Sequence, residues 1–325
     1  MNVLAAMRYL AALNTHGHFA RAAQACHITQ PALSNALRAL EAEYGVVIVR
    51  RGRVFSGLTH EGQQVLHSGL TMLKAEEALR QDLSVGAGQL QGRLRMAAVP
   101  TAIPMLNRFA AMLRAQHPGI TPVVLSMSSL ELESGLEDLS LDLALGYSDR
   151  MPSPGTKGEG KARINAWPQY QEHYYLLCPA QQPGLHKGEP MAWADAGLLP
   201  LCLLTPDMHN RRIVDAGFAA AGCAVTAAME TNSVLGLMMA VSEGGLNSVL
   251  PGALVATLGQ HLQVSVHPLV SPMVQTPIAF LSPSAQAVPR ALQAALALLQ
   301  SPEWQAQCLR YAGPLSGTAK GAPEA

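Results

Sequence analysis

The chain has 325 residues, which exceeds one typical domain and favours two or three. Lys and Arg together number 22, as do Asp and Glu, so an electrostatic partner must be recognised by local clusters rather than by net charge. The five cysteines form no CxxC pair, and we expect a reducing, cytoplasmic environment. Arg8 interrupts the apolar start, and the pattern predicts neither a signal peptide nor a membrane helix.

Residues 1–60 are locally basic, because six arginines against Glu41 and Glu43 leave a charge of +4. A short alanine-rich helix is predicted over residues 19–25 and a second from Gln30 to Gly45, with Thr29 as its N-cap and Pro31 in its first turn. The spacing of four, three and four predicts one buried face. It consists of Leu33, Leu37, Leu40 and Tyr44.

The opposite face of this second helix is small or hydrogen-bonding: Gln30, Ala32, Ser34, Asn35 and Arg38. Such a face can enter a major groove, so the two helices together indicate a helix-turn-helix. The apolar run Val46–Val49, the turn "RRGR" and "VFSGL" predict a hairpin wing whose arginines suit backbone phosphates. The alternative is a small helical domain with a solvated arginine cluster.

The stretch "LAALNTHGHFARAAQACHITQPALSNALRALEAEYGVVIVRRGRVFSGLTHEGQQVL" resembles the start of LysR-type transcriptional regulators, with its R-A-A core, T-Q-P-A-L-S, A-L-E-x-x-x-G and L-T-x-x-G. The resemblance implies a winged helix-turn-helix over residues 1–58. It places Thr29, Gln30, Pro31, Ser34, Asn35 and Arg38 on the recognition helix and Arg51 and Arg53 on the wing. Val49 departs from the family, which often has Phe there.

A helix predicted from Thr59 to about Val85 matches the family's linker helix, assigned to residues 59–88. The spacing of Leu66, Leu70 and Leu73 is consistent with a helix–helix seam, and the alternative is that this helix packs on its own domain. The resemblance implies a dimer through this helix, a homotetramer, promoter DNA as partner and RNA polymerase as a further candidate partner.

From about Gln91, strands alternate with helices in two tandem sets, which predicts an α/β domain with two lobes and a ligand cleft between them. We assign this effector domain to residues 89–303, with lobe 1 at about 89–166 and 269–303 and lobe 2 at about 167–268. The family resemblance implies a fold like that of periplasmic solute-binding proteins.

Hydroxyl and amide groups fall at expected strand-to-helix junctions of both lobes, where helix N-termini favour anions. The candidate effector residues are Pro100, Thr101, Ser128, Ser129, Thr205, Arg211, Asn232 and Ser233. The same residues are ordinary N-caps, and Arg211 can instead pair with Asp207 or Asp215.

No enzyme, cofactor or metal is expected. "HEGQQVLH" has Gln64 where a zinc motif needs its second His, and "GAGQLQG" precedes a strand rather than following one. The segment "LTPDMHNRRIVDAGF", together with the wing "VVIVRRGR", also resembles the branch of the family that accompanies formate dehydrogenase operons, which suggests a small anionic effector. A solute-binding protein without a DNA-binding role is the alternative. Residues 304–325 are expected to form a partly disordered tail.

Overall fold

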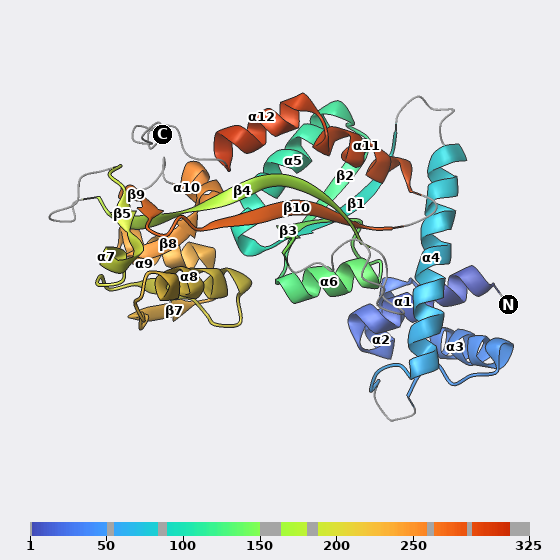
Figure 1. Cartoon of the computed structure of the whole chain (residues 1–325). Coiled ribbons are helices and arrows are strands. Elements are labelled where there is room, and N and C mark those ends of the chain that lie inside the picture. The colour runs from blue at the N-terminus through green and yellow to red at the C-terminus, as the bar shows by residue number, and fades with distance from the viewer. Residues whose placement is uncertain are drawn as a thin grey trace. The chain divides into compact units, whose positions relative to one another are not determined.

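The computed structural model describes residues 2–50, 55–83, 90–149, 164–180, 188–258, 263–284 and 288–312 (Figure 1). Its contacts divide the chain into two compact units. The first is Met1–Leu90 with Ala285–Arg290, and the second is Gln91–Ser284 with Ala291–Ala325. Among the described helices, none combines the length and the hydropathy that crossing a membrane requires.

The first unit contains four helices in its described part: α1 (Val3–His16), α2 (Phe19–Ala25), α3 (Gln30–Tyr44) and α4 (His60–Leu83). The predicted start and end of α3 are confirmed. The Thr29 hydroxyl accepts a hydrogen bond from the Ala32 amide, Pro31 lies in the first turn, and Gly45 ends the helix in the left-handed conformation.

The buried face of α3 is confirmed for its three leucines but not for its last member. Leu33, Leu37 and Leu40 belong to the core of the unit, together with residues of α1 and α2. Tyr44 is 43% exposed instead. It is the last residue of α3, and the helix ends there through Gly45 in the left-handed conformation.

The motifs A-L-E-x-x-x-G, which contains Glu41, and L-T-x-x-G, which contains Gly62, each have a local structural reason. One Glu41 carboxylate oxygen accepts hydrogen bonds from the amides of Ile48 (2.8 Å) and Val49 (3.1 Å), which ties α3 to the segment that follows it. Gly62, in the first turn of α4, lies so close to Ile48 that an added Cβ would stand 2.1 Å from the Ile48 carbonyl oxygen. Only glycine fits there without displacing the backbone.

The predicted strand Val46–Val49 is reduced to a single bridge between Val49 and Leu58. The expectation of a four-residue strand was therefore wrong. A side chain, not a partner strand, occupies the amides of Ile48 and Val49, because Glu41 accepts both. Arg51 and Arg53, expected at the wing tip, lie outside the described residues.

The apolar residues of α4 divide between two faces. Leu66 is buried, and Leu70 and Leu73 are partly buried against the core of the first unit. These three leucines therefore pack on their own domain, which was the alternative to a helix–helix seam. A second apolar set is exposed, at intervals of three and four residues. It comprises Met72 (43% exposed), Ala75 and Leu79 (56%).

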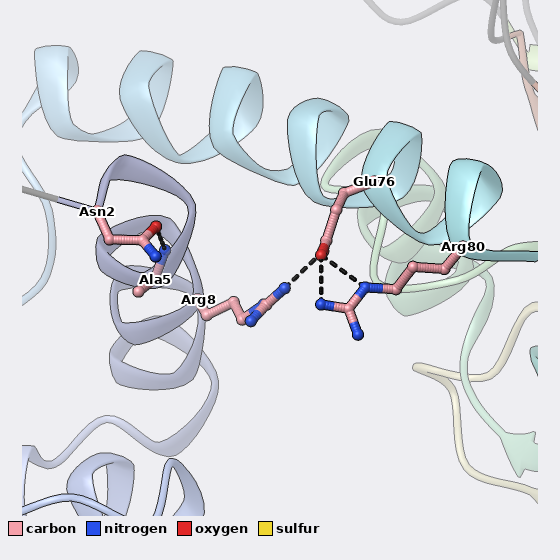
Figure 2. A network of polar contacts seen from close by, with 5 residues as sticks. All are labelled: Asn2, Ala5, Arg8, Glu76 and Arg80. Atoms are coloured by element: carbon pink, nitrogen blue, oxygen red, sulfur yellow. Dashed lines mark hydrogen bonds and ion pairs between the residues drawn. The ribbon is translucent and has the colours of Figure 1, made fainter. Parts of the chain in front are cut away.

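An ion-pair network joins α4 to α1 (Figure 2). The Glu76 carboxylate accepts a hydrogen bond from Arg8 at 2.5 Å and from Arg80, one turn further along α4, at 2.7 Å. These bonds from Arg8 and Arg80 lower the pKa of Glu76. The network is solvent-accessible, so it contributes more to the orientation of α4 relative to α1 than to the free energy of unfolding.

The second unit contains a mixed eight-stranded sheet with the order β2-β1-β3-β10-β4-β9-β5, with β8 pairing with β4, and a separate pair β6-β7. Lobe 1 contains β1 (Gly92–Ala98), β2 (Ile120–Ser126), β3 (Leu143–Tyr147) and β10 (Gln275–Pro283). Its helices are α5 (Ile103–Gln116), α6 (Ser129–Glu137), α11 (Arg290–Leu299) and α12 (Pro302–Tyr311), and the short helix η2 (Pro100–Ala102) precedes α5.

Lobe 2 contains β5 (Met191–Ala192), β6 (Cys202–Leu204), β7 (Met229–Thr231), β8 (Ser248–Pro251) and β9 (Val264–Val270). Its helices are α7 (Trp193–Ala196), α8 (His209–Ala220), α9 (Val234–Ser242) and α10 (Gly252–Leu258). Strands β1, β2 and β3 are parallel, as expected, whereas β10 runs antiparallel to β3 and β4 because the chain re-enters lobe 1 from lobe 2.

Strand β4 (Ile164–Pro179) connects the lobes, and it lies beside β10 (Figure 1). It pairs with β10 as far as His173 and with β8 from Tyr174 onward. The expected boundary at residues 166/167 falls inside this continuous strand. The change of partner, rather than a break in the chain, marks the passage from lobe 1 to lobe 2.

The expected C-terminal tail over residues 304–325 was wrong for its first residues. Residues 304–311 belong to α12, whose Trp304 is fully buried against Phe109 and Phe280 and donates a hydrogen bond to Gln169. Burial of the Trp304 ring explains why these residues form a helix, since an indole removed from water stabilises the element that carries it. Residues 313–325 lie outside the described part of the chain.

Candidate functional site

The first candidate site is the polar face of α3. Thr29, Gln30, Pro31, Asn35 and Arg38 are exposed, and Ser34 is partly exposed. The Arg38 guanidinium donates a hydrogen bond to the Asn35 side-chain oxygen at 3.3 Å, so the two side chains lie on the same face one turn apart. The hydroxyl of Thr29 is used by the helix cap, but the other side chains of this face remain available to a partner.

The second candidate site is a cavity between the two lobes of the second unit. Lobe 1 supplies Val99, Pro100, Thr101, Ser128, Ser129 and Tyr147, and lobe 2 supplies Met208, His209 and Asn210. The empty space around these residues is about 250 Å³ when the open solvent at its mouth is counted, and only a small part of it is enclosed. Three helical segments, η2 with α5, α6 and α8, begin at this cavity, so the positive ends of their dipoles converge there.

A chain of hydrogen bonds crosses the cavity from one lobe to the other. The hydroxyls of Thr101 and Tyr147 are 3.1 Å apart, and the Asn210 side-chain amide donates to the Tyr147 hydroxyl at 3.4 Å. All three residues are buried. Burial is the main cause that raises the pKa of Tyr147 well above its ordinary value, so this phenol stays neutral.

The two serines of the cavity have different roles. Ser128 is engaged in a capping box: its hydroxyl accepts from the Glu131 amide, and its own amide donates to the Glu131 carboxylate at 2.7 Å. The Ser129 hydroxyl is buried and has no hydrogen-bond partner among the described residues. A buried, unpaired hydroxyl costs free energy unless a water or ligand satisfies it.

His209 is the cavity's ionisable side chain on lobe 2. Its ring lies against Tyr147, with centroids 4.6 Å apart, and its Nε2 is 3.8 Å from an Asp149 carboxylate oxygen. Neither lysine nor arginine appears among the described residues that line the cavity. Its polarity therefore comes from hydroxyls, an amide, an imidazole and helix N-termini.

The other four candidate effector residues lie elsewhere. Arg211 donates to Asp215 (2.8 Å), to Glu230 (2.7 Å) and to the Leu204 carbonyl (2.7 Å), so its charge is used inside lobe 2. Ser233 caps α9 and Asn232 is exposed. The Thr205 hydroxyl is buried without a hydrogen-bond partner in the described structure, but it does not line the cavity.

Tyr147 and His209 were not among the candidates chosen from the sequence. Tyr147 ends β3, the third strand of lobe 1, and His209 begins α8 after β6. The rule that selected Thr101 and Ser128, a polar group where a strand ends or a helix begins, applied equally to these positions. No group of His, Cys, Asp and Glu in the described residues could hold a metal ion.

Comparison with known families supplies the deciding observation. The profile of bacterial regulatory helix-turn-helix proteins of the lysR family matches residues 4–63, and that of the LysR substrate binding domain matches residues 87–302. The chain belongs to the LysR family. The two profiles together span most of the described residues, and both candidate sites of this LysR protein lie within them.

Two curated relatives are regulators. The chain is 28% identical over 189 residues to the probable HTH-type transcriptional regulator LrrA of Synechococcus elongatus, covering 58% of this chain and 60% of LrrA. It is 34% identical over 183 residues to a probable hydrogen peroxide-inducible genes activator of Mycobacterium xenopi, covering 55% and 91%. The chain spans about half the length of most other curated relatives that it matches.

Among solved structures, full-length OxyR from Pseudomonas aeruginosa has the same fold. The TM-score is 0.70 at 24% identity, covering 91% of this chain and 94% of that one. The likeness supports the α/β architecture with an N-terminal helix-turn-helix that the sequence predicted.

Proposed function

We propose that this LysR protein is a transcriptional regulator that reads promoter DNA with α3 and responds to a small anion bound in the interlobe cavity. The observation that carries the DNA-binding part is the exposed face of α3 in a capped helix-turn-helix that matches the lysR family profile. The protein is not assigned an enzymatic role, in keeping with its family.

The face of α3 offers the contacts that base edges require. Asn and Gln side chains can bond adenine in the major groove, and Arg can bond guanine or a phosphate. We assign base contacts to Gln30, Ser34, Asn35 and Arg38 and helix placement to Thr29 and Pro31. Arg51 and Arg53 are proposed to hold phosphates, which position the protein without reading sequence.

A gel shift with DNA from upstream of the gene tests this assignment. Asn35→Ala should reduce the preference for this DNA over unrelated DNA by about 10-fold, because one bidentate base contact is worth ~1–3 kcal/mol. Asn14→Ala, an exposed asparagine on α1, is the matched control and should behave as the wild type. Undetectable binding by the wild type at low salt would refute the regulator assignment, and identical behaviour of the two variants would refute the role of Asn35.

The cavity suits a small monoanion. Backbone N–H groups at the starts of α6 and α8, the Ser129 hydroxyl and the Asn210 amide are donors, and no lining carboxylate is present among the described residues to repel negative charge. A dianion would find no lysine or arginine to pair with. The resemblance to the branch that accompanies formate dehydrogenase operons makes formate the first anion to test.

A thiol-based response to peroxide is not supported by the cavity, although one relative is named as an activator of peroxide-inducible genes. None of the five cysteines, all in described parts of the chain, lines the cavity. Burial raises the pKa of the Cys178 and Cys308 thiols to about 12, and it raises the pKa values of Cys26 and Cys202 as well. Reactive thiols are those whose pKa is lowered.

The domain roles follow from these sites. We assign DNA binding to residues 1–58, dimerisation to 59–88 and effector binding to 89–303, with a cytoplasmic location. The exposed residues Met72, Ala75 and Leu79 have the spacing of a helix–helix seam, so we propose that α4 pairs with a second copy through them rather than through Leu66, Leu70 and Leu73. A tetramer and contact with RNA polymerase are further proposals drawn from the family.

A further inference from the structure

Glu172 is a buried carboxyl at the point where β4 passes from lobe 1 to lobe 2. Its exposed fraction is 0%, and it lies opposite Thr276 of β10, two residues before β4 begins to pair with β8. Neither carboxyl oxygen has a hydrogen-bond partner of good geometry in the described structure. A carboxylate in such a place would be an unpaired buried charge, which proteins avoid by keeping the group protonated.

Among the described residues, none of the groups that shift the pKa of Glu172 carries a positive charge. Tyr170 and Tyr174 flank it on the same face of β4, and Tyr147 of β3 is close enough that a charge on Glu172 raises its pKa. The Tyr174 hydroxyl shares a hydrogen bond with Thr276 at 3.2 Å. Burial raises the pKa of Glu172 to about 8, and a hydrogen bond with Tyr174, which lowers this pKa, offsets the effect only in part.

The next charged and titratable groups lie beyond these tyrosines. Cys308 of α12 interacts with Tyr170, and Asp149 interacts with Tyr147. His209 of α8 lies against the Tyr147 ring on the cavity side and is 3.8 Å from Asp149. Tyr147 is therefore the shared element: its ring and hydroxyl line the cavity, and its pKa responds to the charge of Glu172.

We propose that Glu172 is a proton-operated control on the interlobe cavity, which accepts its anion while Glu172 is protonated and loses affinity when Glu172 ionises. This inference rests on the proposed anion site. Glu172 and Tyr147 are separated by β10, which pairs with both of their strands. An ionised Glu172 therefore places a negative charge one strand away from Tyr147, in a region of low dielectric where repulsion of a bound anion is poorly screened. The same charge disfavours the junction of β4 itself, so ionisation also weakens the unit in the absence of any anion.

The test compares the wild-type full chain with Glu172→Gln, which keeps the shape of the protonated acid but cannot ionise. Glu243→Gln, an exposed glutamate of lobe 2, is the matched control. Formate binding is measured by calorimetry at pH 6.5 and pH 9. If only the protonated form binds, about a tenth of the protein is competent at pH 9, so wild-type affinity should fall about 10-fold. At pH 9, Glu172→Gln should bind formate with the affinity that it has at pH 6.5.

A second readout needs no ligand. Because the pKa of Glu172 is raised in the folded protein, the wild type should lose thermal stability as pH rises from 5 to 9, and Glu172→Gln should lose less. Parallel melting curves for the two proteins over this range would overturn the proposal. Equal loss of formate binding in both would overturn it too. No formate binding by the wild type at pH 6.5 would instead count against formate as the proposed effector, with the melting curves still deciding whether Glu172 carries the proton.

Discussion

The hydrogen bonds from the segment after α3 to Glu41 allow the loss of stability in a Glu41 variant to be predicted. Glu41→Ala removes the acceptor of two backbone amides, Ile48, which is fully buried, and Val49, which is half-buried. A hydrogen bond to a charged group contributes roughly 1.5–3 kcal/mol, and an amide left unsatisfied in a buried site costs a similar amount. Because Val49 can reach water in the variant, we expect the first unit to lose roughly 2–4 kcal/mol of stability.

The assay must report on the first unit alone. All three tryptophans, Trp167, Trp193 and Trp304, lie in the second unit, so their fluorescence would miss the change. Hydrogen–deuterium exchange of peptides covering residues 30–50 is suitable. A loss of ~2 kcal/mol should speed exchange of their most protected amides about 30-fold, since ~1.4 kcal/mol corresponds to a factor of ten. Glu43→Ala, on the same helix and exposed, is the control, and equal exchange in the two variants would refute the reasoning.

Two further predictions concern the cavity and α4. Thr101→Val removes the hydroxyl that lies beside the Tyr147 hydroxyl. It should leave DNA affinity within about twofold of the wild type and reduce the shift in DNA binding caused by formate, both measured by fluorescence anisotropy. Loss of DNA binding in the absence of formate would contradict the separation of the two sites. Met72→Glu with Leu79→Glu should shift the sedimentation coefficient toward a smaller species, because like charges would face each other across a paired α4. Thr71→Glu is the control, and an unchanged coefficient in the double variant would exclude this seam.

Features set by a few adjacent residues were predictable from the sequence. Thr29, Pro31 and Gly45 fix the start and end of α3 through the conformations of the residues themselves, so no knowledge of the fold was needed. The three leucines of α3 were found by their spacing. Tyr44 has the same spacing but lies at the helix end, where burial depends on what the chain does next.

Features that depend on distant partners were not predictable. The spacing of Leu66, Leu70 and Leu73 is the same whether they face a second copy or their own core, and only the position of α1 decides between these. Arg211 could have faced a ligand, but Glu230, 19 residues away, lies 2.7 Å from its guanidinium. Thr101 and Ser129 were found as ends of strands and starts of helices, whereas Tyr147 required knowing that β3 ends at the same cavity.

The central claim is that the first unit reads DNA sequence through α3. The most direct measurement is selection of duplexes from a random pool by the full-length wild-type protein, followed by sequencing. One shared sequence should be enriched over successive rounds, and its enrichment should be lost with Asn35→Ala but kept with Asn14→Ala. A wild-type pool without any shared sequence after selection would contradict it.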